Sequence, residues 1–301
     1  MQLKRSLALA TAAAVLLVAC GDDDTDTDAG ATPAGEETTA DAPEAIVSLS
    51  PTATEMLYAV GAGDQVVAVD DQSDFPEGVP VTDLSGYEPN VEAIAGYQPD
   101  LVVAPELPED VTAGLEALDV EVLDIPSAVT LDDTYAQLAD VGVATGHEDE
   151  AADLVAEMRE DIDELAASVP ERDVAPTYYH ELDDTLYSVT SQTFIGEIYS
   201  LAGLENVADA ADPEGEFGGY PQLSPEFIVD ADPDFVFLAD GECCAQDATT
   251  LAARPGFADL SAVRDGHVVV VDEDVASRWG PRVVDFLRTV IEATAGAEAP
   301  A

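Results

Sequence analysis

The chain has 301 residues, of which 47% are hydrophobic, so it is long enough to bury the cores of two modest domains. Asp and Glu number 64 against 9 Lys and Arg, which gives a formal net charge of −55. Such a charge repels nucleic acid and anionic lipid and makes both poor binding partners. The acids are scattered and not blocked, which favours a solvated surface, as in proteins that work in high salt, over a store for cations.

The N-terminus predicts an export signal. Lys4 and Arg5 precede an apolar run from Leu7 to Val18, which is too short to anchor the chain stably across a bilayer. The run ends in Leu17-Val18-Ala19-Cys20, which resembles a lipobox, the site where a lipoprotein is cleaved and its cysteine lipidated. We therefore expect an extracytoplasmic protein held to the cell membrane only by lipid on Cys20. The alternative is an ordinary signal peptide with a chance cysteine.

The segment after this cysteine, Gly21 to Ala42, is rich in Asp, Thr, Gly and Ala. It has too few large apolar residues to bury a core. We therefore expect a flexible acidic tether that lifts a globular body off the membrane.

Strand and helix patterns then alternate. Short apolar runs predict strands over Ala45–Leu49, Gln65–Val69, Leu101–Ala104 and Val120–Leu123. Helical patterns are found at Thr52–Val60, Val91–Gly96, Glu109–Leu118 and Leu131–Ala144. This alternation predicts a parallel sheet that helices cover on both faces.

One long helix is predicted from Glu148 to Val169, just before Pro170. Its apolar residues recur at helical spacing, with acids on the other face, at Ala151, Leu154, Val155, Met158, Ile162 and Leu165. At about 1.5 Å per residue the helix spans roughly 30 Å, which is the width of a small domain. It contains no internal Gly or Pro, so we expect a rigid strut between two lobes.

The alternation restarts after this helix. Strands are predicted over Thr177–Glu181, Leu186–Val189, Phe235–Leu238 and His267–Val271, and helices over Phe194–Ala202, Pro225–Asp230 and Pro281–Ala295. The expected fold is α/β, with two similar lobes of mostly parallel sheet joined by one long rigid helix and a ligand cleft between the lobes. The expected organisation is a signal peptide over 1–19, a tether over 20–44, an N-terminal lobe over 45–146, a connecting helix over 147–170 and a C-terminal lobe over 171–296.

The two halves share one sequence phrase. "VEAIAGYQPDLVVAP" and "PEFIVDADPDFVFLAD" both run from a glutamate, Glu92 or Glu226, through an isoleucine to a Pro-Asp pair and an apolar strand. Asn90 and Ser224 are good N-caps, so each glutamate falls in the first turn of a helix, where a carboxylate offsets the helix dipole by about 0.3–1 kcal/mol. Two exposed carboxylates, one on each lobe, are also suited to a two-fold partner that carries arginines.

The stretch "IVSLSPTATEMLYAVGAGDQVVAVDDQSDFP" resembles the opening of the binding proteins of iron-siderophore and vitamin B12 ABC importers. "PNVEAI", "QLSPEFI" and "SRWGPRVVDFL" extend the resemblance, which covers about Ala45 to Ala295; Arg278, Pro281 and Arg282 match the family's RxxPR stretch. The resemblance implies a rigid helix joining two lobes, with the ligand between them. It also implies that Glu92 and Glu226 dock on arginines of a dimeric permease, which works with an ATPase.

Ligands of such sheets bind beyond the carboxyl ends of the strands. This rule selects loops in both predicted lobes, including Glu106 and the adjacent pair Cys243-Cys244. The candidate ligand-binding residues are Ser50, Pro51, Phe75, Tyr87, His180, Phe194, Tyr220, Arg278 and Trp279. The aromatic members suit a broad apolar ligand, or else they only close the surfaces of the lobes.

The small number of arginines limits which ligands the cleft is expected to bind. Seven arginines follow Arg5, and only Arg278 is expected at the cleft. A triply charged catecholate complex requires several cations, whereas a corrinoid or a neutral hydroxamate requires fewer. The resemblance of the opening segment also favours the cobalamin-type members. We therefore expect a corrinoid or a ferric siderophore, with haem as a third choice.

Other classes of function have less support. The three histidines, His147, His180 and His267, fall on different elements, so we expect no metal site and no cofactor, although His180 alone could reach a ligand. The sequence contains no nucleophile elbow, phosphate loop or metal-helix motif, so we expect a binding protein and not an enzyme. A metal-ion-binding lipoprotein of an ABC importer, a cell-surface hydrolase with paired acids and a structural lipoprotein stay as alternatives.

Cys243 and Cys244 are adjacent, and an exported protein meets an oxidising compartment. A vicinal disulfide would close an eight-membered ring and present an apolar sulfur face to the ligand. Two free thiols and a thiolate site for a soft metal are the alternatives.

Overall fold

The computed structural model describes residues 42–296. The predicted signal peptide, the lipobox with Cys20 and nearly all of the predicted tether lie outside them. No helix within 42–296 combines the length and the apolar character that crossing a membrane requires.

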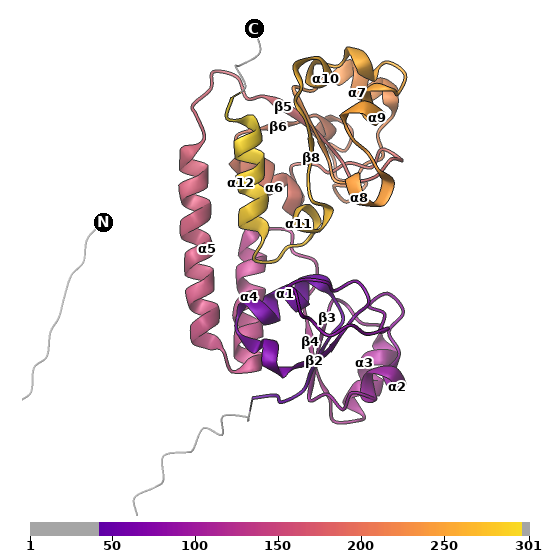
Figure 1. Ribbon diagram of the computed structural model, residues 1–301, viewed down its shortest axis with the longest axis vertical. Helices are drawn as coiled ribbons and strands as arrows, with labels where there is room; N and C mark the ends of the chain where they lie inside the picture. Colours follow the sequence, from indigo (N-terminus) through magenta and orange to yellow (C-terminus); the bar gives the residue numbers. More distant parts are fainter. Residues whose placement is uncertain (1–41, 297–301) are drawn as a thin grey trace, which may run out of the picture. The chain divides into compact units, whose positions relative to one another are not determined.

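The first sheet contains four parallel strands in the order β2-β1-β3-β4. The strands are β1 (Ile46–Ser48), β2 (Val66–Val69), β3 (Leu101–Ala104) and β4 (Glu121–Asp124). The helices of this lobe are α1 (Pro51–Ala59), the 3-10 helix η1 (Ala62–Gln65), α2 (Val91–Ala95), α3 (Glu109–Glu116) and α4 (Leu131–Thr145). Figure 1 shows this lobe in indigo to magenta.

Helices cover both faces of this sheet. Alternate strand residues point to opposite sides and pack into two different clusters. Ile46, Leu101 and Val103 belong to the cluster that includes the buried residues of α1 and α4. Val47 and Val102 belong to a second cluster, which includes Ile94 of α2 and Val111 and Leu115 of α3.

The second sheet repeats the first. Its four parallel strands have the order β6-β5-β7-β8, so β5 and β7 correspond to β1 and β3. The strands are β5 (Thr177–Glu181), β6 (Glu205–Asn206), β7 (Phe235–Leu238) and β8 (Val268–Val270). The longer helices are α6 (Phe194–Leu201), α7 (Pro225–Ala231) and α12 (Val283–Thr294). The short ones are η2 (Val207–Ala210), α8 (Gly241–Cys244), α9 (Ala248–Ala252), η3 (Phe257–Asp259), α10 (Ser261–Asp265) and α11 (Glu273–Ser277).

The repeated sequence phrase forms the same unit in both lobes, a helix followed by a Pro-Asp turn and a central strand. Oδ2 of Asp100 accepts hydrogen bonds from the backbone N–H groups of Glu44 (2.9 Å) and Ala45 (3.0 Å), just before β1. Oδ2 of Asp234 accepts one from the backbone N–H of Thr177 (2.8 Å), the first residue of β5. Each aspartate therefore holds the start of the neighbouring strand, which explains why the phrase occurs twice.

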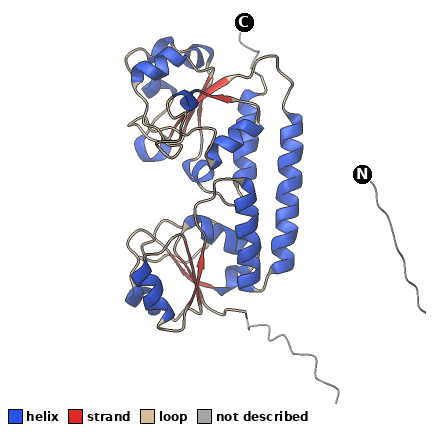
Figure 2. Ribbon diagram, turned by 180° about the vertical axis from the view of Figure 1, so that it is seen from behind, coloured by secondary structure: helices blue, strands red, loops and turns tan. Residues whose placement is uncertain are grey.

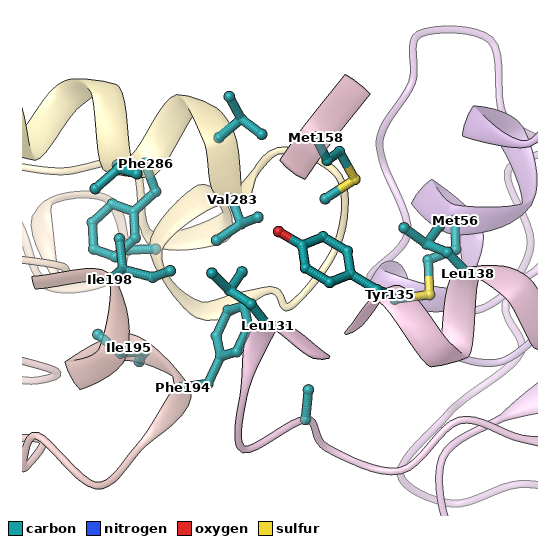
Figure 3. Packing of buried hydrophobic residues seen from close by; sticks show 14 of the residues in the cluster. Met56, Leu131, Tyr135, Leu138, Met158, Phe194, Ile195, Ile198, Val283 and Phe286 are labelled. Atoms are coloured by element: carbon teal, nitrogen blue, oxygen red, sulfur yellow. The ribbon is translucent and has the colours of Figure 1, made fainter. Parts of the chain in front are cut away.

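Helix α5 (Glu148–Ser168) lies beside α4 and α12 (Figures 1 and 2). One apolar cluster passes through these helices and includes residues of both sheets, from Ile46 and Leu101 to Tyr178 and Phe235. Figure 3 shows its middle, where Tyr135 lies near Leu131, Met158 and Val283. The predicted α/β fold of two similar lobes is confirmed.

The strand predicted over Leu186–Val189 is wrong. Leu186 has a left-handed φ of 69°, and the backbone N–H of Leu182 closes a turn onto the carbonyl of Tyr187 (2.9 Å). Ser188 then donates its backbone N–H to the carbonyl of Pro221 (3.0 Å). The segment therefore pairs with the loop around 219–222 and not with the sheet. The prediction also missed β6 and the short helices α8 to α11.

Candidate functional site

A cavity of about 630 Å³ lies at the carboxyl ends of the strands of the first sheet. Its walls come from the loops that follow β1, β2, β3 and β4, from the first turn of α1, and from α11 with the turn after it. The lining residues are Leu49, Ser50, Pro51, Thr52, Asp70, Gln72, Gly86, Tyr87, Pro89, Pro105, Glu106, Leu107, Pro108, Ser127, Asp274, Ser277, Arg278 and Trp279. This is the edge that the strand-end rule selects.

A chain of hydrogen bonds holds the loops after β1 and β2 together. Oγ1 of Thr54 donates to Oγ of Ser48 (2.8 Å) and also meets Oγ of Ser73 (2.8 Å). Ser73 bonds in turn to the carboxylate of Asp70. Asp70 is only 3% exposed, and its burial raises the pKa of its carboxyl. Side chains of β1, α1 and the loop after β2 therefore fix Asp70, which lines the cavity.

Gly86 allows its loop to approach β1 closely. A Cβ at this position would lie 2.4 Å from the carbonyl oxygen of Leu49, which no other residue type could accommodate without moving the backbone. The next residue, Tyr87, lines the cavity and is 88% exposed. The glycine thus places a large aromatic side chain at the open rim.

Arg278 is bound to three carboxylates. Its Nη1 lies 2.9 Å from Oε1 of Glu55 and 3.2 Å from Oδ1 of Asp74, and its Nη2 lies 2.6 Å from Oδ1 of Asp274. Glu55, on α1, is only 2% exposed and also binds Arg282, through Nε (2.9 Å) and Nη2 (2.5 Å). Burial of a carboxylate is costly unless the charge is paired, and here two guanidinium groups pair with it.

Trp279 is held from α4. Its indole Nε1–H donates to Oε1 of Gln137 (3.0 Å), and its carbonyl accepts from Oγ1 of Thr134 (3.1 Å). Gln137 is fixed in turn by a bond from its Nε2 to the carbonyl of Pro126 (2.7 Å). The indole is thus pre-positioned in the cavity wall.

The structure brings together five of the predicted ligand-binding residues, namely Ser50, Pro51, Tyr87, Arg278 and Trp279. The sequence prediction missed Asp70 and Asp274 of the lining and Glu55 behind it. A single acid among 64 carries no local signal that marks it as a partner of a distant arginine.

Phe75 lies in a separate pocket of about 190 Å³, beside Tyr58 and Pro281. The guanidinium of Arg282 stacks over its ring, 4.2 Å from the centroid. Phe75 therefore covers the far side of the Glu55 ion pairs and does not line the main cavity.

His180, Phe194 and Tyr220 do not line the main cavity either. His180 is fully buried, and its Nδ1 lies 2.8 Å from the hydroxyl of Tyr199 on α6. Burial lowers the pKa of its imidazole to about 3, so the ring is neutral. Phe194 packs in the core, and Tyr220 is 44% exposed on the loop that pairs with 186–190. Successive side chains of a strand point to opposite faces of the sheet. His180 points to the face on which Tyr199 of α6 lies.

Cys243 and Cys244 end α8, and their Sγ atoms are bonded to each other. Neither lines the cavity. The backbone N–H of Cys243 donates to Oε2 of Glu273 (3.2 Å). Asp274, which follows Glu273 in the chain, lines the cavity. The pair is therefore one residue removed from the cavity wall. Within residues 42–296, no three His, Cys, Asp or Glu side chains are grouped to hold a metal ion.

Comparison with known proteins places this chain in a protein family. Residues 46–275 match the family described as periplasmic binding protein. The chain belongs to this family. The predicted family resemblance is thereby confirmed.

The periplasmic binding protein is similar to a Bacillus subtilis protein named an uncharacterized ABC transporter substrate-binding lipoprotein, YvrC. The two are 30% identical over 259 residues, which cover 83% of this chain and 79% of that one. The cobalamin-binding protein of Halobacterium salinarum is 33% identical over 251 residues, covering 81% of this chain and 67% of that one. The crystal structure of the vitamin B12-binding protein BtuF of Vibrio cholerae superposes with a TM-score of 0.67 at 27% identity, over 83% of this chain and 96% of that one.

Proposed function

We propose that this protein is the lipid-anchored substrate-binding component of an ABC importer. In this role it captures a corrinoid or a ferric siderophore and delivers it to a permease. The observation that carries the proposal is the cavity at the strand ends, which has a pre-positioned tryptophan in its wall and a tyrosine at its rim. Its volume of about 630 Å³ falls in the range of small-molecule sites.

The choice of ligand rests on the lining. Within the described cavity, Arg278 is the single cationic residue, and it is already bound to carboxylates. A triply anionic catecholate complex would find few donors there. A corrinoid or a ferric hydroxamate presents amides and apolar surface, which suit Tyr87, Trp279 and the four prolines of the lining. The names of the Halobacterium and Vibrio relatives support the corrinoid.

Membrane attachment through lipid on Cys20 is part of the proposal. The motif Leu17-Val18-Ala19-Cys20 supports it, as does the description of the Bacillus relative as a lipoprotein. For the permease we propose that Glu92 and Glu226 form the docking points, one on each lobe. Both lie in the first turn of a helix and are exposed.

Trp279 makes the proposal testable, because it is the only tryptophan of the chain and it lines the cavity. The protein should be titrated with cyanocobalamin, ferrioxamine B as a ferric hydroxamate, a ferric catecholate and haemin, with tryptophan emission as the signal. We expect saturable quenching by cyanocobalamin or by ferrioxamine B. Calorimetry should show that Trp279→Ala weakens the binding by at least about tenfold, since a large apolar contact is lost.

The matched control is Tyr187→Ala, which truncates an exposed aromatic residue outside the cavity and should bind like the wild type. Binding of haemin alone would overturn the choice of ligand. If none of the four compounds bound, the proposed function itself would be wrong.

A further inference from the structure

The charged lining of the cavity is predominantly acidic. Asp70, Glu106 and Asp274 line it, against the single cation Arg278. No lysine or histidine is among the lining residues of the described cavity. A bound anion would therefore share the cavity with three carboxylates.

The one cation is not available to offset them. Arg278 and Arg282 together bind Glu55, Asp74 and Asp274, so two guanidinium groups meet three carboxylates. Arg282 directs its remaining face to the ring of Phe75, outside the main cavity. The formal charges of the network therefore sum to one negative charge.

The three carboxylates that bind the arginines differ in their exposure to the ligand. Glu55 is 2% exposed and lies behind the wall, between the two arginines. Asp74 is 70% exposed, so solvent screens its charge. Asp274 is 34% exposed, lines the cavity and lies 2.6 Å from Nη2 of Arg278. Asp274 is the one member of the network that both faces the ligand space and holds the arginine.

We infer that the cavity selects against anionic ligands and that Asp274 sets this selection by neutralising Arg278. The inference rests on the proposed function and narrows its substrate class. Neutral and cationic complexes, such as amide-bearing corrinoids and ferric hydroxamates, are accepted. Ferric catecholates and carboxylate-bearing derivatives of accepted ligands bind more weakly.

Two ligand pairs that differ in charge but little in shape test the inference. One pair is cyanocobalamin and its monocarboxylic acid, in which one propionamide is hydrolysed to a carboxylate. The other is the pair of N-acetyl and N-succinyl derivatives of ferrioxamine B, which are neutral and singly anionic. We expect the wild type to bind the acidic member about tenfold more weakly, as a like charge at several ångströms in a partly solvated site implies. We expect Asp274→Asn to reduce this gap to about threefold, since Asp70 and Glu106 remain.

Asp153→Asn is the matched control, because it removes the same charge from the exposed side of α5 and should leave the tenfold gap unchanged. High salt should narrow the gap of the wild type, because the Debye length falls to about 3 Å at 1 M. Equal affinity of the wild type for both members of a pair would overturn the inference while the proposed function stood. An Asp153→Asn effect as large as that of Asp274→Asn would also overturn it, because total charge would then be the cause. If no member of either pair bound, the proposed function would be wrong, and the inference that rests on it would be wrong as well.

Discussion

Asp240 is a fully buried carboxylic acid, and neither of its oxygens has a hydrogen-bond partner among the described residues. It follows β7, and its neighbours are Glu181, Arg254 and Tyr179. Glu181 binds the guanidinium of Arg254 through two bonds of 2.6 Å and accepts from the hydroxyl of Tyr179 (2.9 Å). Burial, and then the charge of Glu181, raise the pKa of Asp240 from 3.8 to about 7. Between pH 3.8 and about 7, the folded protein therefore holds a proton that the unfolded chain releases.

This raised pKa predicts how stability depends on pH. The contribution of Asp240 is fully present below 3.8 and is lost as the pH rises through about 7. Asp240→Asn should therefore flatten the fall in the free energy of unfolding between pH 3.8 and about 7, and should be more stable than the wild type at the upper end. Urea unfolding followed by circular dichroism at each pH measures this. Asp230→Asn, an exposed acid of α7, is the control.

His180 contributes with the opposite sign, because burial lowers the pKa of its ring from 6.5 to about 3. Its share of stability is present above 6.5 and is lost as the pH falls. Comparing two proteins that both contain His180 cancels this term. Parallel curves for the wild type and Asp240→Asn would refute the role given to Asp240.

At the scale of elements, α2 and α7 begin alike. Oδ1 of Asn90 accepts from the backbone N–H of Ala93 (3.0 Å), and Oγ of Ser224 accepts from that of Phe227 (3.2 Å). The caps do not involve Glu92 or Glu226, whose carboxylates are exposed. The charge of each glutamate can therefore be removed while its helix keeps its cap.

Replacing both glutamates by glutamine should separate transport from binding. We expect the double variant to bind cyanocobalamin with the affinity of the wild type and to lose stimulation of the ATPase of its cognate importer. The loss of the helix-dipole interaction costs only about 0.3–1 kcal/mol for each helix, so the fold should persist. Glu109→Gln, which changes an exposed first-turn acid of α3, is the control and should stimulate normally. Full stimulation by the double variant would end the docking proposal.

At the scale of the whole described body, the lobes share one core. The apolar cluster that contains strands of both sheets also contains residues of α4, α5 and α12. The pairs of Glu55 with Arg278 and Arg282 join α1 to the segment before α12. Opening the lobes would expose this apolar surface and separate a buried ion pair, so rigid lobes are favoured.

We therefore expect little movement on binding. X-ray scattering profiles with and without saturating cyanocobalamin should be nearly superposable, since α5 has no internal Gly or Pro at which to hinge. Buffer that contains the same concentration of cyanocobalamin without protein controls for unbound ligand. A large fall in the radius of gyration of the wild type would contradict the shared-core argument.

The sequence by itself determined the features whose physical cause is local. Helix α5 follows from apolar residues at helical spacing, and the two Pro-Asp units follow from N-caps and turn chemistry within about fifteen residues. Because parallel strands end at a common edge, the chain order also located Ser50, Tyr87, Arg278 and Trp279 near the cavity.

Only the tertiary structure decided which distant groups meet. The pairing of Glu55 with Arg278 joins positions 223 residues apart, and neither residue carries a local mark of it. The apolar run Leu186–Val189 looks like a strand, but Leu186 turns left-handed and the run pairs with a loop. His180 ends a strand as predicted, yet its ring points into the core under α6. In each case the deciding cause is packing between segments far apart in the chain, which periodicity and turn chemistry do not encode.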